Sequence, residues 1–184
     1  MRIAGGEFKG RIIKVPKVPN LRPSTERIRE AIFSVLGGDI IDSSVADLFC
    51  GSGALGLEAL SRGAKDALLV DSDHHAVLTA RENVKSLRLE SRARIMTANA
   101  LNLRPTQIKD IKIIFADPPY HNEFCQRLVA LLSLQKFDWY GILVLEHESD
   151  WNYDGDDFRI ARRINFGDSA VTFLLRFRPN SSEL

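Results

Sequence analysis

Short apolar runs alternate along this chain with segments whose apolar residues recur at the spacing of an amphipathic helix. The run at 113–116 is unbroken, which is typical of a central strand buried on both faces. We expect strands at residues 45–49, 67–70, 92–97, 111–116 and 141–145. Helical patterns fall between them, from 54, from 73 and over 122–134. Strands that alternate with helices in this way predict an open, mostly parallel α/β sheet.

The C-terminal part of the pattern changes character. Two expected strands, 158–165 and 170–178, are joined directly by the turn 166–169. Because this connection is too short for a crossover, the two strands must be antiparallel. The pattern therefore predicts a seven-stranded, mostly parallel sheet with one antiparallel strand.

The first 24 residues form a basic arm before a domain that we expect to span 25–184. Residues 1–15 alternate loosely around glycines, which predicts a small β-hairpin, and three prolines within 16–23 stiffen the segment after it. Six basic residues against one acid give residues 1–22 a net charge of +5, whereas the whole chain carries +1. A basic arm on an acidic body favours a polyanionic partner, although a solvated, Lys-rich edge hairpin also explains the charge.

A helix is expected immediately after the arm, capped by Ser24 or Thr25. Its apolar residues fall on one face, which we expect to pack on the sheet. Arg27, Arg29 and Glu30 then point away from that face, toward solvent. The pair Gly37-Gly38 ends the helix.

Composition narrows the class of protein. The chain has 184 residues, 45% hydrophobic and 27% charged, which suits one soluble domain. Its two cysteines, at no metal or disulfide spacing, predict buried, reduced thiols in a cytoplasmic protein. No apolar run has the length of a signal peptide or a membrane span. We expect a cytoplasmic monomer that binds neither a metal nor a membrane.

The stretch 45–56 joins the first strand of the domain to its first helix through a glycine-rich turn. Gly51 and Gly53 let the backbone approach a ligand closely and adopt positive φ without strain. The helix that follows directs unpaired N–H groups and the positive end of its dipole to the same place. A strand, a glycine turn and a helix in this order predict a cofactor site.

Two cofactors fit this turn. The spacing Gly51-x-Gly53-x-x-Gly56, with Asp71 placed 20 residues after Gly51, matches the dinucleotide fingerprint of NAD. Asp47 argues against NAD, because a carboxylate at the end of the strand repels a pyrophosphate and attracts a cationic amino group. S-adenosylmethionine carries such an amino group, has a ribose for Asp71, and has no phosphate. We therefore favour S-adenosylmethionine.

The sequence Asp117-Pro118-Pro119-Tyr120 follows a central strand, at the edge where open α/β sheets bind ligands. The prolines fix φ and remove backbone donors, so the turn is rigid. The Asp117 carboxylate and the Pro118 carbonyl can accept from a flat –NH₂ group while the base stacks on Tyr120. Held at about 3–3.5 Å, that nitrogen is positioned to attack a methyl group. These four residues are the predicted catalytic group, unless the loop only ends the strand and caps the next helix.

Together these motifs resemble a known family. The segments 47–53 and 117–120 are similar to those of class I, S-adenosylmethionine-dependent amino-methyltransferases. The segments 2–6, 21–25, 27–33 and 166–170 narrow the likeness to the RsmD family of bacterial 16S rRNA (guanine-N2)-methyltransferases. The resemblance covers nearly the whole chain. It implies a Rossmann-like class I fold, S-adenosylmethionine as cofactor, and 16S rRNA as partner, within the small ribosomal subunit or its assembly intermediate.

The resemblance also implies roles for single residues. Asp47 would hold the methionine amino group and Asp71 the ribose hydroxyls. Where the family usually carries an acid for the adenine amino group, this chain has Asn99, whose side-chain carbonyl can accept without charge. The expected cofactor contacts are Asp47, Phe49, Gly51, Gly53, Asp71, Ser72, Asn99 and Ala100. The expected RNA contacts are Arg2, Lys9, Arg11, Lys14, Arg22 and Arg27.

Other interpretations stay open. Asp-Pro-Pro-Tyr also serves adenine-N6 methylation of DNA, although the basic arm and the lack of a separate target-recognition domain favour RNA. An NAD-linked oxidoreductase is a more distant alternative. A non-enzymatic RNA-binding or assembly factor would keep a vestigial pocket without turnover.

Several conspicuous side chains fit a structural role better than a catalytic one. His74 and His75 start a helix and have no third ligand at metal spacing. Trp139 and Trp151 are expected to anchor the core or a loop. Residues 146 and 147, Glu and His, end the fifth expected strand and could line a base pocket.

Overall fold

The computed structural model describes residues 1–16, 25–119 and 122–178. In chain order the elements are α1 (Glu26–Leu36), η1 (Gly37–Ile40), β1 (Ser44–Leu48), α2 (Ala54–Ser61), β2 (Asp66–Asp71), α3 (His74–Leu87), β3 (Ala93–Thr97), η2 (Ala100–Asn102), α4 (Pro105–Ile108), β4 (Ile113–Ala116), α5 (Asn122–Ser133), η3 (Gln135–Phe137), β5 (Gly141–Glu148), β6 (Arg159–Phe166) and β7 (Ser169–Arg176), where η marks a 3₁₀ helix. Within the described ranges, no helix combines the length and apolar character needed to cross a membrane.

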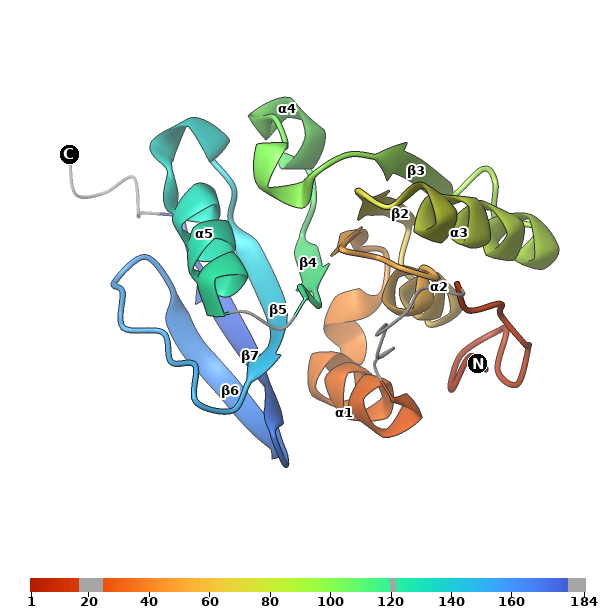
Figure 1. The fold of residues 1–184 in the computed structure, drawn as a ribbon, viewed down its shortest axis with the longest axis horizontal. Coiled ribbons are helices and arrows are strands. Elements are labelled where there is room, and N and C mark those ends of the chain that lie inside the picture. The colour runs from red at the N-terminus through yellow and green to blue at the C-terminus, as the bar shows by residue number, and fades with distance from the viewer. Residues whose placement is uncertain (17–24, 120–121, 179–184) are drawn as a thin grey trace.

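The strands form one seven-stranded sheet in the order β3-β2-β1-β4-β5-β7-β6 (Figure 1). The strands β1 to β5 pair in parallel, whereas β7 is antiparallel to both of its neighbours, β5 and β6. The expected mostly parallel sheet with one reversed strand is confirmed. The strand order changes direction between β1 and β4, which is the point where open α/β sheets bind their ligands.

Helices cover both faces of the sheet and enclose two separate cores (Figure 1). On one face α1, α2 and α3 contribute Ile32, Leu57 and Val84 to a cluster around Phe115. On the other face α5 and the segments near it pack Leu128 and similar side chains against β4 and β5. The central strands are covered on both faces, which explains why their sequences are almost continuously apolar.

Helix starts follow the expected capping chemistry. The Thr25 hydroxyl accepts from the Ile28 N–H at 3.3 Å, and the Asp73 carboxylate accepts from the Ala76 N–H at 2.8 Å. Both bonds satisfy donors that a helix leaves unpaired in its first turn. The short elements η2, α4 and η3 are too brief to show a period, and the sequence pattern did not indicate them.

The expected N-terminal hairpin is reduced to one antiparallel bridge, between Arg2 and Ile12. Two backbone bonds flank it, from the Ile3 N–H to the Arg11 carbonyl and from the Ile13 N–H to the Met1 carbonyl, both at 3.0 Å. In the turn between the two segments, the Glu7 N–H donates to the Ser61 carbonyl of α2 at 2.7 Å. Backbone groups that dock on a helix in this way are not available for a second strand.

Side chains expected in the core are found there. Cys50 and Cys125 are free and buried, and burial, reinforced by nearby carboxylates, raises the pKa of Cys125 to about 12. Trp139 and Trp151 are also buried, and the Trp139 indole donates to the Ile111 carbonyl at 2.8 Å. The thiols therefore stay protonated near neutral pH and serve packing.

Candidate cofactor and substrate site

Three carboxylates meet at the carboxyl edge of the sheet. Asp47 lies in β1, Asp71 ends β2, and Asp117 follows β4. The register pairs Leu48 of the central β1 with a residue of β2 and one of β4, so Asp71 and Asp117 emerge at the same level on either side. The charges of Asp117 and Asp71 both act on the pKa of Asp47. The structure thus brings the glycine turn and the Asp-Pro-Pro loop to one place.

Asp47 is buried, with 2% of its surface exposed. Its Oδ2 accepts from the Gly56 N–H at 2.9 Å, in the first turn of α2. The N-cap of α2 is a glycine without a side-chain acceptor, so Asp47 caps this helix from the neighbouring strand. Burial raises the pKa of Asp47 well above its ordinary value, the Gly56 hydrogen bond lowers it, and the two neighbouring carboxylates raise it further. A bound cation would favour the ionised carboxylate.

The glycine turn is fixed by Asp71. One oxygen of this carboxylate accepts from the Gly51 N–H at 2.8 Å, and the other accepts from the Asp73 N–H at 2.9 Å. Gly51 and Gly53 have φ of 54° and 78°, in the left-handed region that glycine tolerates. Each carboxylate oxygen can accept more than one bond, so Asp71 retains capacity for a hydroxyl group. The acid expected to bind the ribose therefore also orders the turn beneath the cofactor.

The adenine side is less enclosed. Asn99 follows β3, and its side-chain oxygen accepts from the Leu101 N–H at 2.9 Å, which caps the 3₁₀ helix η2. A carbonyl oxygen has two lone pairs, so the same atom can still receive an amino group. Ser72 and Asn99 are exposed, whereas Ala100 is buried. Their contact with adenine remains a prediction.

The predicted catalytic loop is described only in part. Asp117 is half-buried, Pro118 is buried and Pro119 is exposed. Tyr120 lies outside the described residues. The Phe49 ring meets the Phe124 ring edge-on at 6.3 Å, which packs the end of the first strand against the start of α5, directly after the loop. This contact gives Phe49 a packing role at the boundary between the two motifs.

The buried histidine of the fifth strand is structural. His147 lies within β5, which continues to Glu148, beyond the strand expected over 141–145. Its Nδ1 contacts the Glu148 carbonyl and its Nε2 the Thr172 hydroxyl, both at 2.7 Å. Burial lowers the pKa of His147, so the ring is neutral at pH 7. Both ring nitrogens are engaged, and the side chain ties β5 to β7.

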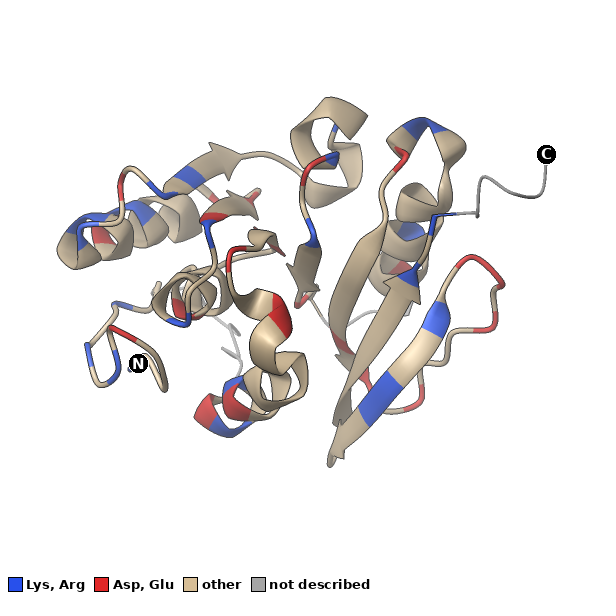
Figure 2. Ribbon diagram, turned by 180° about the vertical axis from the view of Figure 1, so that it is seen from behind, with Lys and Arg blue, Asp and Glu red and all other residues tan. Residues whose placement is uncertain are grey.

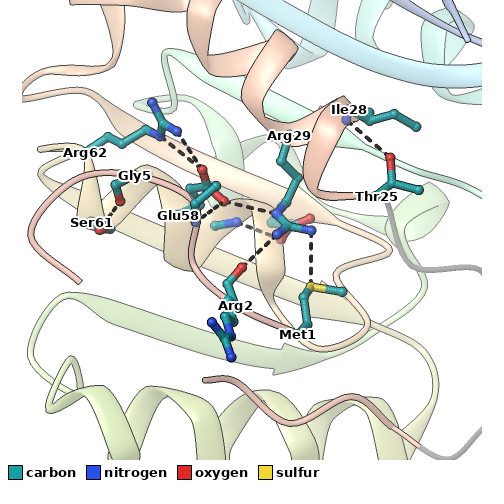
Figure 3. Close-up of polar contacts among 12 residues, drawn as sticks. Met1, Arg2, Gly5, Thr25, Ile28, Arg29, Glu58, Ser61 and Arg62 are labelled. Atoms are coloured by element: carbon teal, nitrogen blue, oxygen red, sulfur yellow. Dashed lines mark hydrogen bonds and ion pairs between the residues drawn. The ribbon is translucent and has the colours of Figure 1, made fainter. Parts of the chain in front are cut away.

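Arg29 contradicts the expectation that it points to solvent, because only 1% of its surface is exposed. Its Nε donates to the Glu58 carboxylate of α2 at 3.0 Å, and its Nη2 donates to the Arg2 carbonyl at 2.8 Å (Figure 3). The amphipathic pattern of α1 was interpreted with one buried face. The N-terminal arm and α2 also cover the side that carries Arg29, so this helix is enclosed more fully than its pattern predicted.

Glu58 is the centre of this buried polar cluster (Figure 3). It is fully buried and also accepts from Arg62 at 2.8 Å and from the Ala4 N–H at 3.4 Å. Ser61, one turn later, donates to the Gly5 carbonyl at 2.6 Å and accepts from the Phe8 N–H at 2.9 Å. The sequence analysis did not identify Glu58 and Ser61 as the residues that bind the N-terminal arm. A single acid in the otherwise apolar α2 was the available signal, because a buried charge requires partners.

The expected RNA contacts form two separate groups. Arg2, Lys9, Arg11, Lys14 and Arg27 are all exposed, and Arg22 lies outside the described residues. Figure 2 shows basic segments near the N-terminus and on the edge strand β6. In the arm, Lys14 pairs with Glu82 of α3 at 2.8 Å and Arg11 donates to the Ser86 carbonyl at 3.4 Å. Arg27 instead stands 6.0 Å from the Phe166 ring, at the end of β6.

A groove of about 550 Å³ opens at the opposite edge of the sheet. It is lined at the starts of β1, β2 and β3 by residues such as Ser44, Asp66 and Ala93. Both acidic and basic side chains border it. Open α/β sheets bind ligands at the carboxyl ends of their strands, so this groove is not part of the candidate site.

The chain matches known proteins over most of its length. The family model described as Conserved hypothetical protein 95 matches residues 1–175. Ribosomal RNA small subunit methyltransferase D of Escherichia coli strain K12 is 39% identical over 133 residues, which cover 72% of this chain and 67% of that protein. The putative rRNA methyltransferase YlbH of Bacillus subtilis is 36% identical over 157 residues, which cover 82% of this chain and 84% of that protein.

A solved structure is also similar to this chain over nearly its whole length. The putative methyltransferase yhhF from Escherichia coli superposes with a TM-score of 0.80 at 31% identity, covering 96% of this chain and 97% of that chain. The class I methyltransferase fold expected from the motifs is confirmed, and this chain belongs to the RsmD family, the family whose model is described as Conserved hypothetical protein 95.

Proposed function

We propose that this protein transfers a methyl group from S-adenosylmethionine to N2 of one guanine in 16S rRNA. The observation that carries the proposal is the meeting of the buried Asp47 with the rigid loop that begins at Asp117, on neighbouring parallel strands. One motif suits a cationic cofactor and the other an exocyclic amine. Family membership supports the same reaction, because the named relative is a ribosomal RNA methyltransferase.

The cofactor site is selective through its charge. Asp47 and Asp71 lie on either side of the glycine turn, and Asp117 adds a third negative charge within reach. A pyrophosphate would be repelled here, whereas an ammonium group and a sulfonium are attracted. Asp47 binds the amino group of the methionine part, Asp71 the ribose, and Asn99 the adenine amine. These contacts favour S-adenosylmethionine over NAD.

Catalysis depends mainly on positioning. The Asp117 carboxylate and the Pro118 carbonyl accept the two hydrogens of the guanine amino group, which directs its nitrogen lone pair toward the cofactor. The bound cofactor supplies the methyl group; the new N–C bond forms as the S–C bond breaks, and the sulfur keeps the electron pair. The methylated nitrogen then loses a proton, which Asp117 accepts. No strong base is required before the transfer.

The partner is ribosomal RNA, within the small subunit or an assembly intermediate, and the protein acts as a cytoplasmic monomer. The exposed basic side chains of the arm contact RNA phosphates, which positions the RNA without selecting a base. Base selection falls to the loop beginning at Asp117.

Labelled methyl transfer tests the proposal. Small subunits that lack the mark, and naked 16S rRNA in parallel, are incubated with S-adenosylmethionine, and the modified RNA is digested to nucleosides. We expect N2-methylguanosine with wild-type protein and none with Asp117→Ala. The matched control is Asp110→Ala, an exposed acid at the other edge of the sheet, which should retain full transfer. N6-methyladenine, or unchanged turnover in Asp117→Ala, would contradict the assignment. Preferential binding of NAD in calorimetry would also overturn it.

A further inference from the structure

A buried asparagine joins the N-terminal arm to the glycine turn. Asn83 lies on α3 with 1% of its surface exposed. Its Oδ1 accepts from the Lys14 N–H at 2.8 Å, and its Nδ2 donates to the Lys14 carbonyl at 2.9 Å and to the Ser52 carbonyl at 2.9 Å. Both hydrogens and the oxygen of the carboxamide are used, and all the bonds reach outside α3.

The two segments that meet at Asn83 belong to different parts of the site. Lys14 is in the returning part of the arm, and its side chain is among the expected RNA contacts. Ser52 lies between the two glycines that carry the cofactor turn. Asp71 holds the turn at Gly51, next to Ser52, and the beginning of the arm is held by Glu58 and Ser61 (Figure 3). Asn83 is therefore a direct link between two independently fixed segments.

We propose that Asn83 is a positioning residue that couples docking of the arm to binding of the cofactor. When the arm is docked, the carboxamide is oriented by Lys14 and holds the Ser52 carbonyl, so the turn keeps the shape that receives the cofactor. When the cofactor orders the turn, the same carboxamide is held in place for Lys14. The coupling is reciprocal by thermodynamic necessity. The effect on cofactor binding is argued from the geometry alone, whereas the effect on RNA binding rests on the proposed function.

The strength of such a link follows from burial. Removing the carboxamide leaves the Ser52 carbonyl and both backbone groups of Lys14 without these bonds, and unsatisfied buried groups are disfavoured. Coupling between two sites commonly changes affinity by a factor of 5 to 150. We therefore expect Asn83→Ala to weaken binding of S-adenosylhomocysteine about fivefold or more. The same variant should raise the KM for RNA more than it lowers kcat.

The first test uses the wild-type protein and does not depend on a variant. Hydrogen exchange of the backbone amides in residues 3–14 is measured with and without S-adenosylhomocysteine. We expect the cofactor product to slow exchange at Lys14, although Lys14 is not in the glycine turn. Exchange at Lys14 that is indifferent to S-adenosylhomocysteine would overturn the coupling.

The second test compares variants. Asn83→Ala, which removes three hydrogen bonds, is measured beside Trp139→Phe, which removes one buried hydrogen bond, to the Ile111 carbonyl, on the other face of the sheet. Glu82→Gln removes only the surface ion pair with Lys14. Calorimetry with S-adenosylhomocysteine should show weakened binding in Asn83→Ala alone, together with faster exchange at Lys14 that the ligand no longer slows. Equal affinity in Asn83→Ala and Trp139→Phe, at similar loss of Tm, would reduce Asn83 to a structural role and overturn the proposal.

The readouts separate this proposal from the proposed function. If RNA is not the substrate, the KM comparison fails while the calorimetric and exchange results stand. If RNA is methylated as proposed but Asn83→Ala binds S-adenosylhomocysteine normally, only the coupling is refuted.

Discussion

At the scale of single residues, Asp47 serves two purposes that conflict. Its carboxylate caps α2 through the Gly56 N–H, and it faces the place where a cationic amino group is proposed to bind. Burial without a cation raises its pKa, so the ionised form is disfavoured in the protein alone. A residue placed for binding in this way reduces stability until the ligand arrives.

The pH dependence of cofactor affinity follows from this raised pKa. Protonation of Asp47 removes the charge that attracts the amino group, so affinity for S-adenosylhomocysteine should fall as the pH is lowered. The fall should begin at a higher pH than a carboxyl group with its ordinary pKa of 3.8 would allow. Calorimetry over a pH series measures it. Asp47→Asn should bind weakly at every pH with a flat profile; a pH-dependent loss that persists in this variant would assign the titration to another group.

The stability of the ligand-free protein should change in the opposite direction. A raised folded-state pKa means that the native state binds more protons than the unfolded chain between the two pKa values. The stability contributed by Asp47 is therefore complete below its unfolded pKa and is lost as the pH rises through its folded pKa. Asp47→Asn avoids this loss and should raise the free energy of unfolding near neutral pH. Urea unfolding at neutral pH measures this change. A destabilised variant would show that the cap on Gly56 outweighs the buried charge.

At the scale of elements, the sequence predicted what local patterns determine. The strands β1 to β7 and the helices α1, α2, α3 and α5 fall within a few residues of their expected positions, because their apolar periods and caps are local. The surroundings of α2 could not be predicted in this way. Its outer face is covered by the arm, through contacts such as Ala4 with Glu58 that join residues 54 apart. The same long-range covering explains the wrong expectation for Arg29.

The buried cluster around Glu58 predicts the order in which three substitutions reduce the stability of the protein. Glu58→Leu removes the carboxylate that pairs with the buried Arg29 guanidinium, and breaking a buried ion pair typically costs about 3–5 kcal/mol. Arg29→Met should cost less, because Glu58 keeps Arg62 as a partner, and Arg62→Met least, because Arg62 is partly exposed. Urea unfolding of the three variants measures the order. An equal loss in all three would mean that the arm, and not the ion pair, supplies the stability.

At the scale of the whole molecule, the candidate site shows which features a single sequence can reveal. Asp47, Asp71 and the loop from Asp117 were found because each lies at or directly after the carboxyl end of an apolar strand, and parallel strands end at a common edge. Asn83 and Ser61 were not found, because an ordinary polar residue inside a helix carries no signal until its partner from another segment is in place. The meeting of these acids at one edge of the sheet was therefore predictable from sequence, whereas the contacts that position the arm were not.

The basic arm gives a last prediction, about how RNA binding depends on salt. Each lysine or arginine that contacts a phosphate releases counterions, so the slope of log affinity against log salt should decrease by about 0.9 for each such residue removed. Lys9→Gln and Arg11→Gln should each lower RNA affinity uniformly across sequences and reduce the slope by that amount. The matched control is Lys109→Gln, an exposed lysine at the end of α4, far from the arm. If the arm variants behave like this control, RNA binds elsewhere and the charge of the arm serves solubility at an exposed edge. The surface around Arg27 and β6 would then be the next to test.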